Sequence, residues 1–170
     1  DAAFEPGRDG QPGTLRRVWL FDCNPPHNKF RNGQKLPYNK NREGPSELIA
    51  TPVFANGRIY VAVGQDSRHG PGPGCMSCID ASQTGDVTAS AKIWQNFDVD
   101  RSFSSAAVTE DGLVFIADYT GILRYYLNGE EITAHRKYAR NVIFKVYGDG
   151  LFLFIEASCV LCLITVIQIP

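Results

Sequence analysis

The chain has 170 residues, of which 44% are hydrophobic, and its formal net charge is −1. This length and composition allow about one folded domain. The near-neutral charge excludes the broad basic surface on which nucleic-acid-binding proteins depend. Sixteen glycines and ten prolines favour a β-rich fold with many turns.

Residues 1–14 are polar and contain spaced glycines and prolines, which predicts an N-terminal tail. The chain starts at Asp1 without an initiator Met or a signal peptide, so we expect a processed chain or a piece of a longer protein. Residues 15–22 are predicted to form a strand that carries Trp19. Trp94 ends the next unit in the same way. A Trp at the end of each repeat would pack between neighbouring sheets, and a plain core aromatic is the alternative.

Residues 24–47 contain almost no aliphatic side chains and have more basic than acidic residues. A loop of this length inside a compact domain is typically either functional or disordered. In repeat architectures such insertions gather on one face, which is often the binding face. A solvated loop without a specific role is the alternative.

Residues 48–94 contain four short apolar runs joined by tight turns: 51–55, 58–63, 76–79 and 92–94. Asn56 and Gly57 separate the first two runs, and both residue types accept the positive φ of a type I′ turn. The segment therefore predicts a four-stranded meander that begins with a β-hairpin.

The same turn signal recurs at Asp111-Gly112 and at Asp149-Gly150. Residues 113–127 align with residues 151–165 without a gap. Four-stranded units that repeat every 40 to 55 residues or so are typical of β-propellers, because one small sheet cannot bury both faces without neighbours. We therefore expect an all-β fold, a partial β-propeller of about three four-stranded antiparallel blades.

The C-terminal residues 151–170 are long and apolar enough to resemble a membrane helix. Glu156 lies inside this run, and the repeat alignment predicts two strands instead. The repeat becomes degenerate towards the end of the chain. We therefore divide the chain into a tail (1–14), blades with a long loop at 24–47 (15–132), and a degenerate further blade or aberrant segment (133–170).

Several motifs between about residues 15 and 131 resemble the pyrroloquinoline-quinone-like (PQQ-like) β-propeller repeat proteins, in the secreted or periplasmic form of planctomycete-type bacteria. They read CNPP, GPSELIATPVFANGRIYVAVGQD, GxGCxxCIDASQTGD, IW and DxDRSFSS. The resemblance implies a ring of seven or eight blades and a periplasmic or extracellular location. It also implies a structural blade motif at Asp80, Thr84, Gly85 and Trp94. In that motif the Asp80 and Thr84-Gly85 turn fixes a strand connection, and Trp94 docks one blade on the next.

The five cysteines are Cys23, Cys75, Cys78, Cys159 and Cys162. The Cys75–Cys78 pair is not a haem attachment motif, since no His follows it, and it enters a strand rather than a helix. Zinc binding by Cys23, His27, Cys75 and Cys78 has plausible spacing, but residues three apart on a strand point to opposite faces. A disulfide and unpaired thiols are the alternatives, and we predict no metal site.

Two functions follow from the resemblance. A PQQ-dependent alcohol or sugar dehydrogenase would bind the quinone under a vicinal disulfide and beside calcium; no Cys-Cys pair exists here. Aspartates at strand ends are the calcium candidates, although turn formation explains them as well: Asp66, Asp98, Asp100 and Asp118. We favour a non-catalytic binding platform that needs no cofactor, binds no nucleic acid and does not span a membrane. Its loop face would bind a protein, peptide or carbohydrate, and its sheets would pack on further blades.

Overall fold

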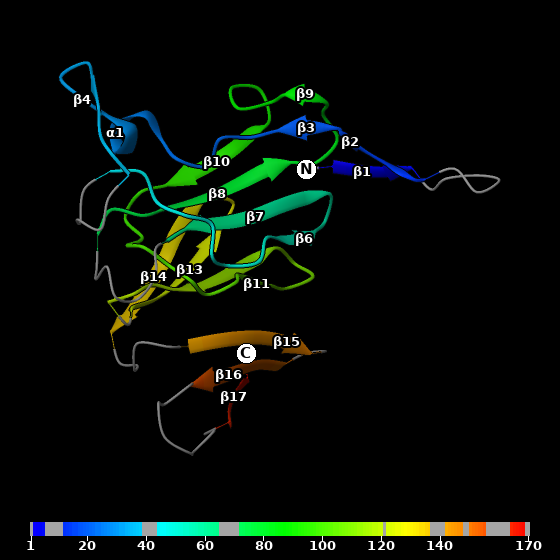
Figure 1. The fold of residues 1–170 in the computed structure, drawn as a ribbon. Coiled ribbons are helices and arrows are strands. Elements are labelled where there is room, and N and C mark those ends of the chain that lie inside the picture. The colour runs from blue at the N-terminus through cyan, green and yellow to red at the C-terminus, as the bar shows by residue number, and fades with distance from the viewer. Residues whose placement is uncertain are drawn as a thin grey trace.

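The computed structural model describes residues 2–5, 12–38, 44–64, 72–120, 122–136, 142–147, 150–155 and 164–168. Within these ranges the chain consists of short β-strands and one helical turn, so the predicted all-β class is confirmed. Three antiparallel sheets follow one another along the chain and form successive tiers (Figure 1).

The first two sheets are four-stranded meanders. The first sheet consists of β6 (Val53–Ala55), β7 (Arg58–Val63), β8 (Cys75–Asp80) and β10 (Lys92–Asn96). The second sheet consists of β11 (Ala107–Val108), β12 (Leu113–Ala117), β13 (Ile122–Leu127) and β14 (Glu130–Arg136). Because β14 runs through residues 132 and 133, the predicted boundary there cuts a strand of the second sheet.

The third sheet has three strands among the described residues. They are β15 (Val142–Tyr147), β16 (Gly150–Ile155) and β17 (Ile164–Gln168). The predicted strands within residues 151–170 are thus confirmed where the structure describes them. In the described part of the chain, no helix has the length and apolar character needed to cross a membrane.

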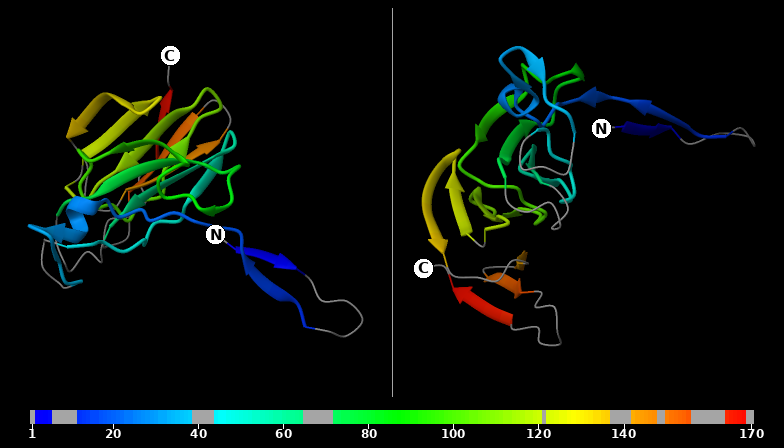
Figure 2. Two further views of the ribbon diagram at one scale, coloured as in Figure 1. Left: turned by 90° about the horizontal axis from the view of Figure 1, so that it is seen from above. Right: turned by 60° about the vertical axis from the view of Figure 1, so that its left-hand side comes forward.

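The N-terminal region is more ordered than the sequence predicted. The predicted tail contains β1 (Ala2–Glu5), which pairs with β2 (Thr14–Arg17) in a hairpin that projects from the body (Figure 2). The predicted strand at 15–22 is divided, because β3 (Trp19–Leu20) leaves β2 and pairs in parallel with β9 (Gly85–Asp86).

The segment at residues 24–47 is also partly folded. It contains the helical turn α1 (Pro26–Lys29) and a hairpin of β4 (Phe30–Arg31) and β5 (Gln34–Lys35). Pro26 lies in the first turn of α1, where its missing N–H costs nothing. The predicted long loop therefore contains these short elements in its described part, which we call the insertion (residues 24–38 and 44–47).

The hairpin at Asn56-Gly57 forms as predicted, with φ of 52° and 72° at the two turn residues. Asp111-Gly112 makes a different turn. Gly112 has φ of 88° and its N–H donates to Thr109 O at 3.0 Å, whereas Asp111 keeps negative φ. This three-residue turn ends in a glycine bulge, so the two hairpins are related but not identical.

The third predicted turn is shifted. Asp149 lies outside the described residues, and Gly150 is the first residue of β16, paired with Tyr147. Strand β17 begins at Ile164, four residues later than the gapless alignment with β13 requires. The second and third units therefore differ in the length of the connection between their strands. The aligned residues Glu156, Ser158, Val160 and Leu161 lie outside the described residues.

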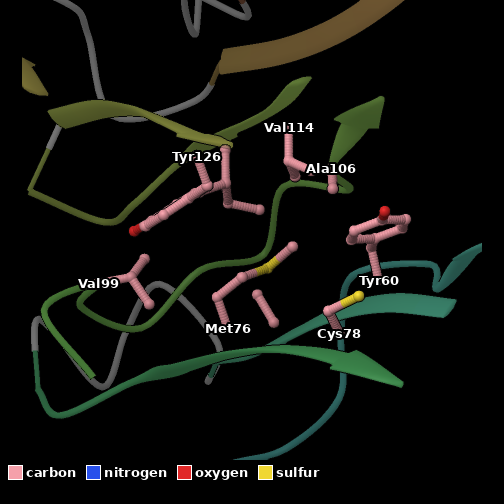
Figure 3. Packing of buried hydrophobic residues seen from close by; sticks show 9 residues of the cluster. Tyr60, Met76, Cys78, Val99, Ala106, Val114 and Tyr126 are labelled. Atoms are coloured by element: carbon pink, nitrogen blue, oxygen red, sulfur yellow. The ribbon is translucent and has the colours of Figure 1, made fainter. Parts of the chain in front are cut away.

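The core forms two clusters on the opposite faces of the first sheet, because side chains alternate along its strands. On β7, Tyr60 and Ala62 face the second sheet, while Val61 and Val63 face the other way. The cluster between the sheets, which we call the seam, is drawn in Figure 3. Its buried members are Tyr60, Ala62, Met76, Cys78, Val99, Ala106, Val114, Ile116 and Tyr126.

The connection between the first two sheets runs against the ends of β7 and β8. The N–H of Ser102 donates to Val63 O at 3.1 Å, and that of Arg101 to Gly72 O at 2.9 Å. A Cβ atom at Gly64 would come within 1.9 Å of Ser102 O, so glycine is required for this approach. These contacts fix the second sheet relative to the first.

Candidate functional site

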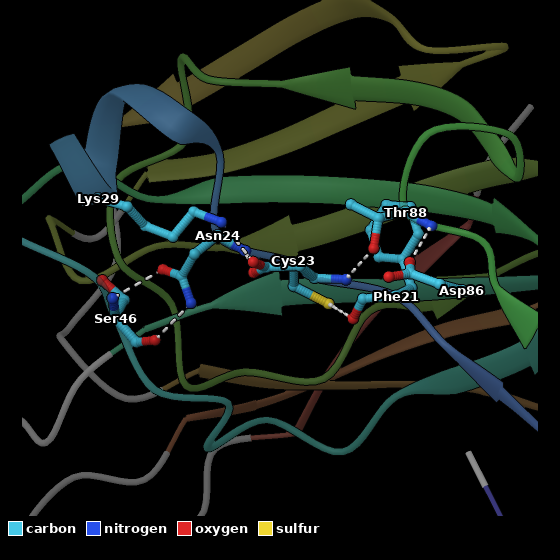
Figure 4. A network of polar contacts seen from close by, with 8 residues as sticks. Phe21, Cys23, Asn24, Lys29, Ser46, Asp86 and Thr88 are labelled. Carbon is cyan, nitrogen blue, oxygen red and sulfur yellow. Dashed lines mark hydrogen bonds and ion pairs between the residues drawn. The ribbon is translucent and has the colours of Figure 1, made fainter. Parts of the chain in front are cut away.

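The two ends of the insertion are tied together by one side chain (Figure 4). Asn24 Nδ2 donates to Ser46 O at 2.9 Å, and Ser46 N–H donates to Asn24 Oδ1 at 2.8 Å. The side-chain amide of Asn24 thus bonds both the N–H and the C=O of Ser46, as the backbone of a neighbouring strand would. Because these residues are 22 positions apart, the two bonds close the insertion at its base.

Further bonds anchor this base to the connection between β8 and β10. Asp22 Oδ1 accepts the N–H of Asn24 at 3.0 Å, and Asp22 Oδ2 pairs with Lys29 of α1. The N–H of Asp22 donates to Thr88 Oγ1 at 3.1 Å, and that of Thr88 to Asp86 Oδ1 at 3.1 Å. The bonds from Thr88 hold the pKa of Asp86 below its usual value. The insertion is therefore connected to the segment that follows β9.

The part of the insertion that follows α1, residues 30–38, which we call the tip, presents aromatic and basic side chains to solvent. Phe30 is 48% exposed and Tyr38 54% exposed, and Arg31 and Lys35 are exposed on the same hairpin. At the other side, the ring of His27 makes an edge contact with Phe97, with centroids 4.8 Å apart. The insertion thus combines a fixed base with an exposed aromatic and basic tip.

The predicted motif residues Asp80, Thr84 and Gly85 form the turn after β8. The Asp80 carboxylate accepts the N–H and hydroxyl of Ser82, at 2.9 and 2.7 Å, and these bonds lower its pKa. Gly85 has φ of 88° and donates its N–H to Val18 O at 3.0 Å. Thr84 is exposed. This turn leads from β8 into β9, the strand that pairs with β3.

Trp94 lies in the seam between the first two sheets. Its ring centroid is 6.2 Å from that of Tyr60 and 5.7 Å from that of Tyr126. The ring also lies against Gly129, in the turn between β13 and β14. Trp94 therefore bridges the two four-stranded sheets.

Trp19 occupies a different position, although the sequence placed the two tryptophans in equivalent positions. It is half-buried on the outer face of the first sheet and belongs with the other core cluster. There it lines a groove of about 390 Å³. The groove residues are Trp19, Leu20, Phe21, Cys23, Leu48, Pro52, Phe54, Ile59, Val61 and Ile79.

A buried charged cluster lies where the connection between the sheets meets β12. Arg101 is 1% exposed and Asp118 4% exposed. Asp118 accepts the N–H and hydroxyl of Thr120, the N–H of Ile122, and Arg124 Nε at 3.3 Å. Its carboxylate is therefore fully engaged by donors of its own chain.

This cluster does not fit calcium. Burial and the negative charge of Asp118 raise the pKa of Asp100, while Arg124 and Arg101 oppose that shift. Two guanidinium groups beside two carboxylates leave no excess negative charge for a dication. Of the other calcium candidates, Asp98 is exposed and Asp66 lies outside the described residues.

The structure separates the cysteines that zinc would need. Cys75 packs in the outer cluster with Cys23, whereas Cys78 packs in the seam, as the alternation along a strand predicts. All three are buried free thiols, and burial raises the pKa of each. The described residues contain no group of three potential metal ligands. Cys159 and Cys162 lie outside them.

Sequence reasoning missed the order in the insertion and the groove. A signal for the first was present, because Asn32-Gly33 is the same dipeptide as Asn56-Gly57 and forms the same turn, with φ of 50° and 77°. The groove had no local signal, because it depends on how β3 crosses the first sheet.

No protein-family model matches the chain, and no curated protein matches it.

Proposed function

We propose that the chain is a segment of a PQQ-like β-propeller and acts as a non-catalytic binding platform. Two consecutive four-stranded meanders, stacked face to face through Trp94, support this proposal. The proposal includes a periplasmic or extracellular location, which rests on the sequence resemblance. Further blades of the same kind would continue the stack.

The observation that carries the binding role is the tied insertion. Asn24 and Ser46 fix its base, and a helical turn and a hairpin give it a defined shape. A loop that is already ordered loses less conformational entropy on binding than a free loop does. Loops held by a rigid scaffold are where binding residues concentrate.

The chemistry of the tip indicates the kind of ligand. Phe30 and Tyr38 offer flat apolar surface with few rotatable bonds. Arg31 and Lys35 add positive charge beside Phe30. This combination suits an acidic carbohydrate or an acidic peptide, whose rings or side chains stack on the aromatics while carboxylates meet the cations.

The test is to screen the purified chain against arrays of acidic glycans and acidic peptides. A ligand found there should lose at least tenfold in affinity with the double variant Phe30→Ala, Tyr38→Ala, which is about 1.4 kcal/mol. Leu127→Ala is the matched control, since Leu127 is 40% exposed and lies on β13 of the second sheet. Equal losses in both variants would remove the insertion from the proposal.

The dehydrogenase is tested in the same preparation. The chain is mixed with pyrroloquinoline quinone and calcium, and dye reduction is followed with ethanol and with glucose. Stoichiometric quinone binding with turnover would overturn the non-catalytic role.

A further inference from the structure

The groove on the outer face of the first sheet is an open apolar surface. Its floor is formed by Ile59, Val61 and Ile79, and its rim carries Leu48 and Phe54. Phe54 is 69% exposed and Leu48 52% exposed. Large apolar side chains gathered in this way mark a surface that another molecule covers.

Comparison of the two meanders shows which surface of the second sheet corresponds to the groove on the first. The residues of each meander can be numbered from the glycine that ends its first turn, Gly57 or Gly112. In both sheets the second strand starts at the next residue and pairs antiparallel with the third strand. Ile59 then corresponds to Val114, and its cross-strand partner Ile79 corresponds to Tyr126. By the same count Val61 corresponds to Ile116. The exposed Phe54 is the cross-strand partner of Ile59 and so corresponds to Val108, the cross-strand partner of Val114.

In the second sheet, those positions are buried against a neighbour. Val114, Ile116 and Tyr126 are at most 1% exposed in the seam, and Val108 packs on the same cluster. The face that covers them carries Tyr60 and Met76 of the first sheet. The groove is therefore the same surface one repeat earlier, with β3 covering only part of it.

We infer that a second copy of this chain docks in the groove, with its third sheet packed on the first sheet of its neighbour. The third sheet lies beyond the second sheet, at the other end of the stack (Figure 1), and β15 contacts β11 and β12. The sequence of β16, GLFLFI, contains no polar side chain, and three of the five residues of β17, ITVIQ, are apolar. Docking of this end on the groove of a second copy continues the seam that already joins the first two sheets.

Such an interface is head-to-tail, so it joins two different surfaces and adds copies in series or closes a ring. It uses a different surface from the tip of the insertion and does not rest on ligand binding there. A negative result in the ligand-binding test therefore does not contradict docking of a second copy, and a negative result in the docking test does not contradict ligand binding.

The test is sedimentation velocity of the full chain over a wide range of concentrations. Wild type should form species larger than the 18.8 kDa monomer, and their share should rise with concentration. Phe54→Glu should sediment as a monomer throughout, because a carboxylate in an apolar interface is not solvated. Phe97→Glu is the control: Phe97 is 49% exposed, lies outside the groove, and the change should leave association intact.

A mixing experiment separates head-to-tail docking from groove-to-groove dimers. Fluorescently labelled Phe54→Glu chains keep a normal third sheet, so they should join the assemblies of excess unlabelled wild type. Their circular dichroism must match that of wild type. A monomeric wild type, association of Phe54→Glu alone, or exclusion of the labelled chain from wild-type assemblies would each overturn the inference.

Discussion

Trp94 of β10 lies so close to Gly129 that a Cβ atom at Gly129 would come within 2.6 Å of Trp94 Cγ. Gly129 has φ of 91° in the turn between β13 and β14. The backbone of the second sheet thus forms one wall of the site for the indole of the first.

Gly129→Ala should lower the free energy of unfolding by about 2–4 kcal/mol, from backbone strain at positive φ and from overpacking against the indole. Gly112→Ala is the matched control, since Gly112 has φ of 88° but nothing lies within 4 Å of its Cβ position. It should cost only about 1–2 kcal/mol of strain. Chemical denaturation measures both, and equal losses would show that Trp94 moves away freely.

Trp94→Ala should cost about 3 kcal/mol, near the lower end for a large aromatic because the ring is only half-buried. The loss comes from its contacts with Tyr60 and Tyr126. Urea denaturation of the variant beside wild type gives the value. A loss below about 1 kcal/mol would mean that the ring is peripheral to the seam.

Local turn chemistry explains what the sequence could predict. Asn56-Gly57 determines its hairpin because both residues tolerate positive φ, and the strands on either side follow from it. Asp111-Gly112 was predicted to repeat that turn, but a glycine after Asp also suits the three-residue turn that forms there. Strand existence was therefore predictable, while the register of each repeat was not.

Structural features that depend on contacts between residues far apart in the sequence could not be predicted. The pairing of β3 with β9 joins residues 19–20 to residues 85–86, and it carries Trp19 to the outer face of the first sheet. Asn24 binds the backbone of Ser46 across the insertion, and no periodicity in the sequence signals such a bond. The insertion and the groove both depend on these long-range contacts.

Asn24→Ala should loosen the base of the insertion without unfolding the sheets. The amide of Ser46 loses its acceptor and its carbonyl loses a donor, so the change should cost about 1–2 kcal/mol. Hydrogen exchange checks this locally: the Ser46 amide should exchange faster, while the amides of β7 and β8 should keep their rates. Unchanged exchange at Ser46 would show that the insertion is held by other contacts.

The buried thiols of Cys23 and Cys75 should make the protein less stable in alkali. Burial raises the pKa of Cys23 from 9.0 to about 12 and that of Cys75 to about 11. In the unfolded chain these thiols ionise near pH 9, so above that pH the unfolded state binds fewer protons than the folded state. Stability is then complete below pH 9 and falls as the pH rises towards 11 and 12.

The measurement is the free energy of unfolding of wild type and Cys23→Ala between neutral pH and about pH 10.5, where unfolded thiols are ionised. Tyrosines and lysines titrate in both proteins, so the difference between the two curves isolates Cys23. That difference should be constant below pH 9 and should then change in favour of the variant, because alanine has no thiol to ionise in the unfolded chain. Parallel curves over the whole range would show that Cys23 ionises as readily in the folded protein as in the unfolded one.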